Sequence, residues 1–319
     1  MEDKVDEIEE EEEESLLNEC ISSSKFIRSL IHRKDKLIVK EKLPFNSKFK
    51  RTVVVGDIHG DYKKLVEVLR QAKLIDSKNN WIGKDAVLVQ VGDLMDRGDD
   101  TKKVLDLMIK IKKQATNNVF ILLGNHELLN LGYDYSDTTK GDIESFGGLS
   151  QRYKEFSING KYGNLLRKEM NITMILDDNL YVHAGLLPKY AKIGMDQMNE
   201  RAHTALINSD VPEEEFNYDL PLFDEEVFGI RGGPIWDRSL AEDTEEEVCE
   251  KLEETLKITN AKRMIIGHTV QKFGAINTKC ENKLILIDVG LTRRYGGYFG
   301  YLEMLNNKGE IWARYEKKN

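Results

Sequence analysis

The chain has 319 residues, 40% of them hydrophobic and 32% charged, which is enough for one large domain or two ordinary ones with a sizeable core. It contains no run of about 20 apolar residues of the kind that crosses a bilayer, and its acidic N-terminus lacks a secretory signal pattern, so we expect no membrane association. Cys20, Cys249 and Cys280 show no metal-site or disulfide spacing, which favours a reducing cytoplasmic or nuclear compartment.

The net acidity of the chain belongs to its N-terminus. Residues 1–14 contain ten acidic residues against Lys4 alone, which gives −9, the formal net charge of the whole chain. Such a run repels itself and stays solvated, so the sequence predicts a disordered acidic tail over residues 1–22. A basic approach segment follows over residues 23–50. It lacks a known nucleic-acid motif, so nucleic acid is not the favoured partner.

From residue 51 to residue 319 the pattern predicts one domain of alternating strands and helices. Short apolar, β-branched runs are typical of buried strands, and they lie at 52–55, 86–91, 119–123, 180–182, 264–266 and 284–287. Apolar stripes predict helices at 61–74, 100–115, 195–207 and 244–257. Strand–helix–strand order implies right-handed βαβ units. The chain ends in a predicted antiparallel hairpin, 298–305 with 310–315.

Five of the six apolar runs end in side chains that ligate metals, namely Asp57 with His59, Asp93, Asn125 with His126, His183, and His268. Open α/β sheets bind ligands outside the carboxyl ends of their strands, so these groups are expected at one edge. A single His after a strand is usually structural, but four of the six histidines occupy such positions. Carboxylate, imidazole and amide ligands without Cys suit Mn, Fe or Zn. Using all of them takes two ions, which one carboxylate can bridge.

The strand ends carry a resemblance to a known family. Residues 57–59, 92–98, 124–127 and 183–185 read DIH, GDLMDRG, GNHE and HAG. They resemble the signature blocks of the phosphoprotein phosphatases, a family of calcineurin-like metallophosphoesterases, in the family's order and with similar spacing. The resemblance covers roughly residues 51–300. It implies an α/β fold in four α/β/β/α layers, in which a central β-sandwich is flanked by α-helices.

The resemblance also implies a two-metal site. Asp93 would bridge the ions, and Asp57 and His59 would hold the first of them. The second ion would be completed by Asn125, His183 and His268. The reaction implied is in-line attack on phosphorus by a hydroxide that bridges the two ions.

Further residues of the same blocks receive roles from the resemblance. His126 would be the general acid that protonates the leaving oxygen. Asp96 would orient the His126 ring and keep it positively charged. Arg97 would clamp the phosphate with its fixed fork of donors, and Asn125 would also contact it.

Some blocks depart from the common eukaryotic pattern and are similar to the Shewanella-like protein phosphatases. No Arg precedes Gly124, residues 233–238 read GPIWDR, and residues 288–297 read DVGLTRRYGG. Arg238 is the candidate for a second phosphate clamp and Arg231 is its rival, with a structural salt bridge as the alternative. Tyr295 is a weaker candidate for the lining of the site.

Three functions stay open at this point. The leading hypothesis is phosphomonoester hydrolysis on phosphoproteins, at Ser/Thr or at Tyr, because Shewanella-like enzymes include tyrosine-directed members. The first alternative is a dinucleoside polyphosphate or another small phosphoester, since the same metal core acts on the same reacting group. The second is an inactive binding or regulatory module, but such proteins usually lose metal ligands or the acid, and here all are present. The sequence identifies no regulatory partner.

Overall fold

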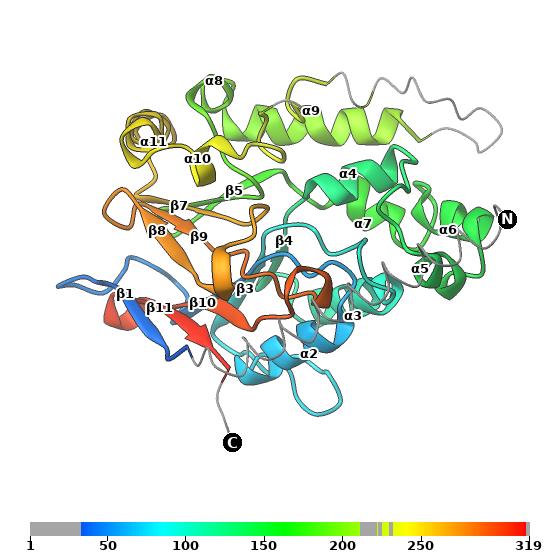
Figure 1. Cartoon of the computed structure of the whole chain (residues 1–319), viewed down its shortest axis with the longest axis horizontal. Coiled ribbons are helices and arrows are strands. Elements are labelled where there is room, and N and C mark those ends of the chain that lie inside the picture. The colour runs from blue at the N-terminus through cyan, green and yellow to red at the C-terminus, as the bar shows by residue number, and fades with distance from the viewer. Residues whose placement is uncertain (1–32, 211–221, 223–224, 230–231, 317–319) are drawn as a thin grey trace, which may run out of the picture. The chain divides into compact units, whose positions relative to one another are not determined.

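The computed structural model describes residues 33–210, 222, 225–229 and 232–316 (Figure 1). The acidic tail over residues 1–22, the first part of the basic segment and Arg231 therefore lie outside the described residues. The catalytic unit consists of two facing sheets with helices on their outer sides, which confirms the expected α/β/β/α arrangement. In the part of the chain that is described, no helix has the length and apolar character needed to cross a membrane.

The first sheet has six strands in the order β1-β11-β10-β2-β3-β4. The three strands β2, β3 and β4 are parallel, and β10, β11 and β1 continue the sheet in antiparallel pairs. All residues of β3 are buried because both faces of the sheet are covered, which accounts for apolar runs without alternation. The bounds are β1 (Lys36–Lys40), β2 (Arg51–Val55), β3 (Ala86–Gln90), β4 (Val119–Ile121), β10 (Gly300–Leu305) and β11 (Glu310–Tyr315).

The second sheet has five strands in the order β5-β6-β7-β9-β8. Here β6, β7 and β9 are parallel, while β5 and β8 form antiparallel edges. Tyr181 of β6 reaches across to the first sheet, where its hydroxyl lies 3.6 Å from Sδ of Met304 in β10. The bounds are β5 (Thr173–Leu176), β6 (Asn179–Val182), β7 (Arg263–Ile266), β8 (Asn277–Lys279) and β9 (Leu284–Leu286).

Helices cover the outer face of each sheet. On the six-stranded sheet lie α2 (Tyr62–Gln71) and α3 (Thr101–Gln114), and α2 begins where the carboxylate of Asp61 accepts the Lys64 N–H at 3.0 Å. The other sheet carries α8 (Pro188–Ala191), α9 (Met195–Asn208), α10 (Ser239–Glu242) and α11 (Glu245–Thr259). Between β4 and β5 along the chain lie four further helices, α4 (Asn125–Leu131), α5 (Lys140–Ser145), α6 (Leu149–Phe156) and α7 (Gly163–Lys168).

Residues 35–50 of the basic segment are part of the folded unit that contains residue 51 onward. The compact unit begins at Asp35, because β1 pairs with β11 at the edge of the first sheet. An ion pair of 2.5 Å between Lys40 and Glu310 accompanies this pairing. Only three apolar residues stand between lysines in β1, so the sequence pattern was too short to indicate a strand.

The expectation that the cysteines are unpaired was wrong. Cys249 of α11 and Cys280, in the turn between β8 and β9, form a disulfide with an S–S distance of 1.99 Å. The 31-residue separation of the two cysteines resembles no local motif, so only the packing of α11 beside β8 brings them together. The pairing removes the cysteine-based argument for a reducing compartment.

Candidate metal centre and active site

The carboxyl ends of parallel strands from both sheets converge on one buried site. The first sheet contributes the residues that follow β2, β3 and β4, and the second sheet those that follow β6 and β7. The side chains are at most 7% exposed, and they belong to Asp57, His59, Asp93, Asn125, His183 and His268. The structure therefore brings together the six metal ligands expected from the sequence.

The backbone at this site is held in an uncommon conformation. His59, Asp93 and His268 have φ values of 47°, 56° and 63°, and Asp96 and Arg97 follow with 65° and 64°. Non-glycine residues seldom adopt positive φ, and such strain gathers where surrounding contacts determine the geometry. One such contact is the carbonyl of Asp93, which accepts the N–H of His59 at 3.0 Å.

Two glycines are required by close approach to the carboxylates. A Cβ on Gly124 would lie 2.2 Å from Oδ1 of Asp93, and one on Gly267 would lie 2.3 Å from Oδ1 of Asp57. Neither position can hold a larger residue without displacing a predicted ligand. This explains why glycine precedes Asn125 in the sequence.

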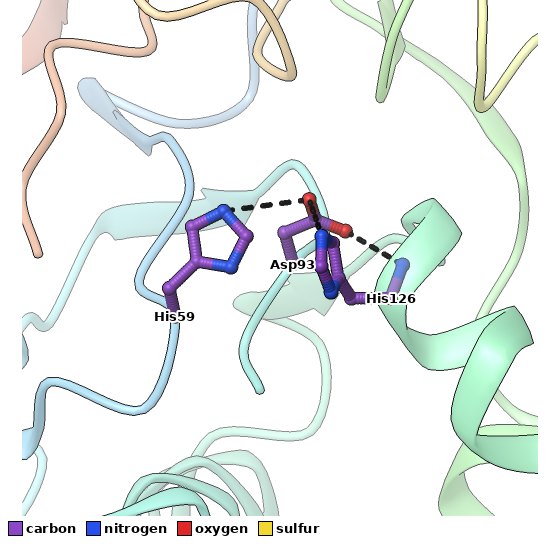
Figure 2. Close-up of side chains that lie close together, drawn as sticks. All are labelled: His59, Asp93 and His126. Carbon is purple, nitrogen blue, oxygen red and sulfur yellow. Dashed lines mark hydrogen bonds and ion pairs between the residues drawn. The ribbon is translucent and has the colours of Figure 1, made fainter. Parts of the chain in front are cut away.

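Asp93 is the centre of the cluster (Figure 2). Its Oδ2 lies 3.3 Å from Nε2 of His183, 3.6 Å from Nε2 of His59 and 3.9 Å from Nε2 of His126. Asp57 approaches the same region, with its Oδ2 4.0 Å from Nε2 of His59. A carboxylate in this position can bridge two ions.

The second half of the cluster surrounds His183. Its Nε2 lies 3.0 Å from Oδ1 of Asn125 and 3.1 Å from Nδ1 of His268. The amide of Asn125 begins α4 directly after β4, which is how a strand end delivers it to the site.

The protonation pattern of these groups fits a bound cation. Nδ1 of His183 lies 2.9 Å from the carbonyl of Val91, and Nδ1 of His59 lies 3.1 Å from the carbonyl of Met95. A ring nitrogen facing a carbonyl must donate, so in the neutral imidazole Nε2 carries the lone pair. Both lone pairs face carboxylate oxygens, and Nε2 of His268 is buried without a hydrogen-bond partner among the described residues. Buried acceptors that face one another are stabilised by a cation or a proton between them; at His183 burial lowers the pKa, but the carboxylate of Asp93 outweighs it and raises the pKa.

The electrostatics support the same reading. Burial raises the pKa of Asp57 well above its ordinary value, and repulsion from Asp288 and Asp93 raises it further. Burial lowers the pKa of His268 to about 2, with His183 adding to the effect, and burial lowers the pKa of His59 to about 4. Crowded carboxylates beside neutral imidazoles are the arrangement that a metal ion stabilises.

His126 and Asp96 form a separate pair beside the metal ligands. Oδ2 of Asp96 lies 2.9 Å from Nδ1 of His126 and accepts from Asn130 at 2.7 Å, while its Oδ1 accepts the hydroxyl of Thr138 at 2.7 Å. Burial lowers the pKa of His126, but the carboxylates of Asp93 and Asp96 outweigh it and raise the pKa to about 9. A pKa of about 9 corresponds to a protonated ring at neutral pH.

Glu127 accepts hydrogen bonds from the backbone of the site. Its carboxylate is fully buried and accepts the N–H groups of Gly124 at 2.7 Å, Asp93 at 2.9 Å and Leu94 at 2.8 Å. These bonds join the turn after β3 to the start of α4. The Glu of the GNHE block thus has a structural role that its sequence position alone did not reveal.

The two arginines differ in their surroundings. Nη2 of Arg97 lies 2.7 Å from Asp137, while its Nε is buried without a partner among the described residues. Nη1 of Arg238 donates to the carbonyl of His268 at 3.4 Å and to the hydroxyl of Thr269 at 3.3 Å. Within the described ranges no carboxylate lies within 4.0 Å of Arg238, so the salt-bridge alternative finds no partner there. Arg231 cannot be compared, because it lies outside them.

A pocket of about 500 Å³ opens over the cluster. It is lined by the expected residues His59, Asp93, Arg97, Asn125, His126, Arg238, His268 and Tyr295. Sequence reasoning did not identify the additional lining residues, which are Leu129, Asp137, Trp236, Glu242, Thr269 and Val270. Trp236 and Glu242 flank Arg238 along the chain, which was a usable signal, whereas nothing in the sequence around Asp137 indicates its place beside Arg97.

Known proteins resemble this chain over most of its length. A model of the calcineurin-like phosphoesterases matches residues 50–272. An uncharacterized protein of Schizosaccharomyces pombe is 35% identical over 79% of this chain and 76% of its own. Shewanella-like protein phosphatase 1 of Plasmodium berghei is 29% identical over 81% of this chain and 72% of its own. A cold-active protein-tyrosine phosphatase of a psychrophilic Shewanella species is 27% identical with a TM-score of 0.67, covering 81% of this chain and 76% of that structure. The resemblance inferred from the strand ends is confirmed, and the chain belongs to the calcineurin-like phosphoesterase family.

Proposed function

We propose that the protein hydrolyses phosphomonoesters at a two-metal site and that its substrates are phosphoproteins. The observation that carries the proposal is the group of buried acceptor atoms around Asp93, which lines the same pocket as Arg97 and Arg238. A cation centre beside two guanidinium groups that line the same pocket is suited to a phosphate dianion.

The metal ligands divide between the two sheets. Asp57 and His59 would hold one ion, Asp93 would bridge, and the second ion would be completed by Asn125, His183 and His268. When bound, two such ions lower the pKa of a water molecule and neutralise charge on the phosphoryl group. The donor set of imidazole, carboxylate and amide suits Mn, Fe or Zn.

His126 is the proton donor in this proposal. Asp96 bonds its Nδ1, so the opposite nitrogen is the one available to the pocket. A leaving oxygen that departs as an alkoxide or phenolate needs a proton, and an imidazolium held by a buried carboxylate can supply it. Asp96 acts through His126 and is therefore a positioning residue.

Arg97, Arg238 and Asn125 are the proposed phosphate-binding groups. Among the described residues Arg238 makes two long contacts, to His268 and Thr269, so most of its donors remain for the phosphate. Arg97 uses one nitrogen for Asp137, and that contact fixes the direction of the guanidinium. Binding from two sides orients the phosphorus for in-line attack.

The walls of the pocket bear on the choice of substrate. Trp236 and Tyr295 line it together with Leu129 and Val270. An aromatic leaving group packs well against such walls, which favours phosphotyrosine over phosphoserine and phosphothreonine. The protein-tyrosine phosphatase activity in the name of the Shewanella structure agrees with this preference.

A panel of substrates tests the proposal. The full-length protein, loaded with Mn²⁺, is given one peptide carrying phosphotyrosine, phosphoserine or phosphothreonine at the same position, and diadenosine tetraphosphate. We expect phosphate release from the peptides, fastest from phosphotyrosine. Cleavage of the dinucleotide alone would mean a small-phosphoester hydrolase. No turnover by protein that demonstrably holds both ions would mean a binding module.

A further inference from the structure

One strand end at the site, that of β9, delivers no residue to the proposed metal ligands. β9 is parallel to β7, and the chain continues the pairing for one residue, where the N–H of Ile287 donates to the carbonyl of Ile266 at 2.9 Å. The next residue is Asp288. The ends of β2, β3, β4, β6 and β7 all deliver proposed ligands, and Asp288 at the end of β9 has no role in the proposed reaction.

Asp288 is a buried carboxylate with one free oxygen. The residue is 2% exposed. Its Oδ1 accepts the N–H of Gly290 at 2.9 Å, which forms the turn that follows the strand. Its Oδ2 is buried and has no hydrogen-bond partner in the part of the chain that the structure describes. Leaving a buried charged oxygen without a donor is costly unless a cation or an ordered ligand faces it.

The surroundings locate Asp288 beside Asp57. A Cβ on Gly56, the residue before Asp57, would lie 3.4 Å from the Cα of Asp288. After burial, Asp288 is the strongest influence that raises the pKa of Asp57, ahead of Asp93. Burial also raises the pKa of Asp288 itself to about 6, and among the charged groups that act on it is Arg238, which lowers it. The close backbone approach at Gly56 therefore places Asp288 beside the turn that carries Asp57, a proposed ligand.

We propose that Asp288 is a further carboxylate of the metal centre, whose free Oδ2 would raise the protein's affinity for the ion held by Asp57 and His59. With Asp288 included, three parallel strands of each sheet deliver metal-site residues. Three carboxylates also balance the charge of two divalent ions better than Asp57 and Asp93 alone. This inference rests on the proposed two-metal function.

The test is Asp288→Asn in the full-length protein. Asparagine keeps the size of the side chain and an oxygen for the Gly290 N–H, but it removes the charge. Metal content is measured by elemental analysis after dialysis, and the Mn²⁺ and Zn²⁺ dissociation constants are measured by competition with a chromophoric chelator. We expect the affinity for one ion to fall by about 10- to 100-fold while the other ion is retained. Asp237→Asn is the matched control, because Asp237 is also buried but both of its oxygens accept hydrogen bonds.

A second readout separates a metal-site role from a purely structural one. In EDTA, Asp288→Asn should melt at or above the wild-type temperature, because repulsion with Asp57 is relieved. With metal added, it should gain less in melting temperature than the wild type. Asp288→Ser, which removes the carboxylate with a smaller side chain, should behave in the same way and serves if the asparagine variant does not fold.

The outcomes distinguish this inference from the proposed function. Two ions bound by Asp288→Asn with wild-type dissociation constants would overturn the inference, as would an equal loss in the Asp237→Asn control. If the wild type itself binds no divalent ion, the proposed two-metal function fails, whatever the variant does.

Discussion

The pair formed by His126 and Asp96 makes a quantitative prediction for Asp96→Asn. Asp96 accepts three hydrogen bonds, from His126, Asn130 and Thr138. An amide can keep its oxygen toward His126 and Asn130 and turn its NH₂ toward Thr138, because a hydroxyl can also accept. The substitution therefore removes charge while retaining the geometry.

The size of the effect follows from the bond to His126. A hydrogen bond to a charged group contributes about 1.5–3 kcal/mol and one between neutral groups about 0.5–1.5 kcal/mol. Losing the charge of Asp96 should thus reduce the stabilisation of the protonated His126 ring by about 1–2 kcal/mol. If that stabilisation persists in the transition state, kcat falls about 5- to 30-fold. Stability should change little, because the desolvation cost of the buried charge is removed as well.

The assay compares phenyl phosphate with p-nitrophenyl phosphate in the presence of Mn²⁺. The phenolate of phenyl phosphate needs the proton more, so the loss in kcat should be larger for it. Metal content should match the wild type. Asp99→Asn, an exposed carboxylate three residues away, is the control. An equal loss on both substrates, or no loss at all, would refute the assignment of Asp96 to the support of a general acid.

Four further changes have expected outcomes. His126→Ala should lower kcat by about 10²–10⁴-fold while both metals remain, and loss of metal in that variant would make His126 a ligand. Asp93→Asn should impair binding of both ions in elemental analysis, and retention of two tightly bound ions would argue against a bridge. Glu127→Gln should cost about 1–3 kcal/mol in urea unfolding, because both oxygens accept backbone N–H groups and no rotation avoids opposing an NH₂ to one of them. Cys280→Ser should lower stability by up to about 3–4 kcal/mol for a 31-residue separation, Cys249→Ser should match it, and an unchanged unfolding curve would mean that the two thiols are not bonded.

The buried centre of the fold was predictable from the sequence, and its edges were not. Runs such as 86–91 are apolar on both faces because helices and the opposite sheet cover them, so their composition reports a strand directly. The C-terminal hairpin was also found, with β10 and β11 joined by a turn at residues 306–309. By contrast β1, β5 and β8 are edge strands with partly exposed residues, and their identity depends on the neighbour with which they pair.

The same distinction applies to the site. Proposed ligands such as Asp57 and His183 follow the ends of strands. Because the carboxyl ends of parallel strands lie at one edge of a sheet, the sequence alone predicted that they would lie close together. Asp137 reaches Arg97 from a loop, across 40 residues, and no periodic pattern indicates such a contact. Asp288 is an intermediate case. It follows a predicted strand, but it was noted only as a departure from a familiar block, and its burial and free oxygen are visible only in the structure.

The division of the centre between two sheets has a consequence for folding. Asp57 and Asp93 come from one sheet, and His183 and His268 from the other, so neither sheet can form the ion site alone. One contact between the two sheets is already present, since the backbone N–H of His268 donates to the side-chain carboxylate of Asp57 at 3.0 Å. The positive φ angles and the buried charges at this junction destabilise it, and bound ions would offset that cost. Ions that bound both halves would link the two sheets, so a variant that weakens metal affinity should gain less stability than the wild type when metal is added.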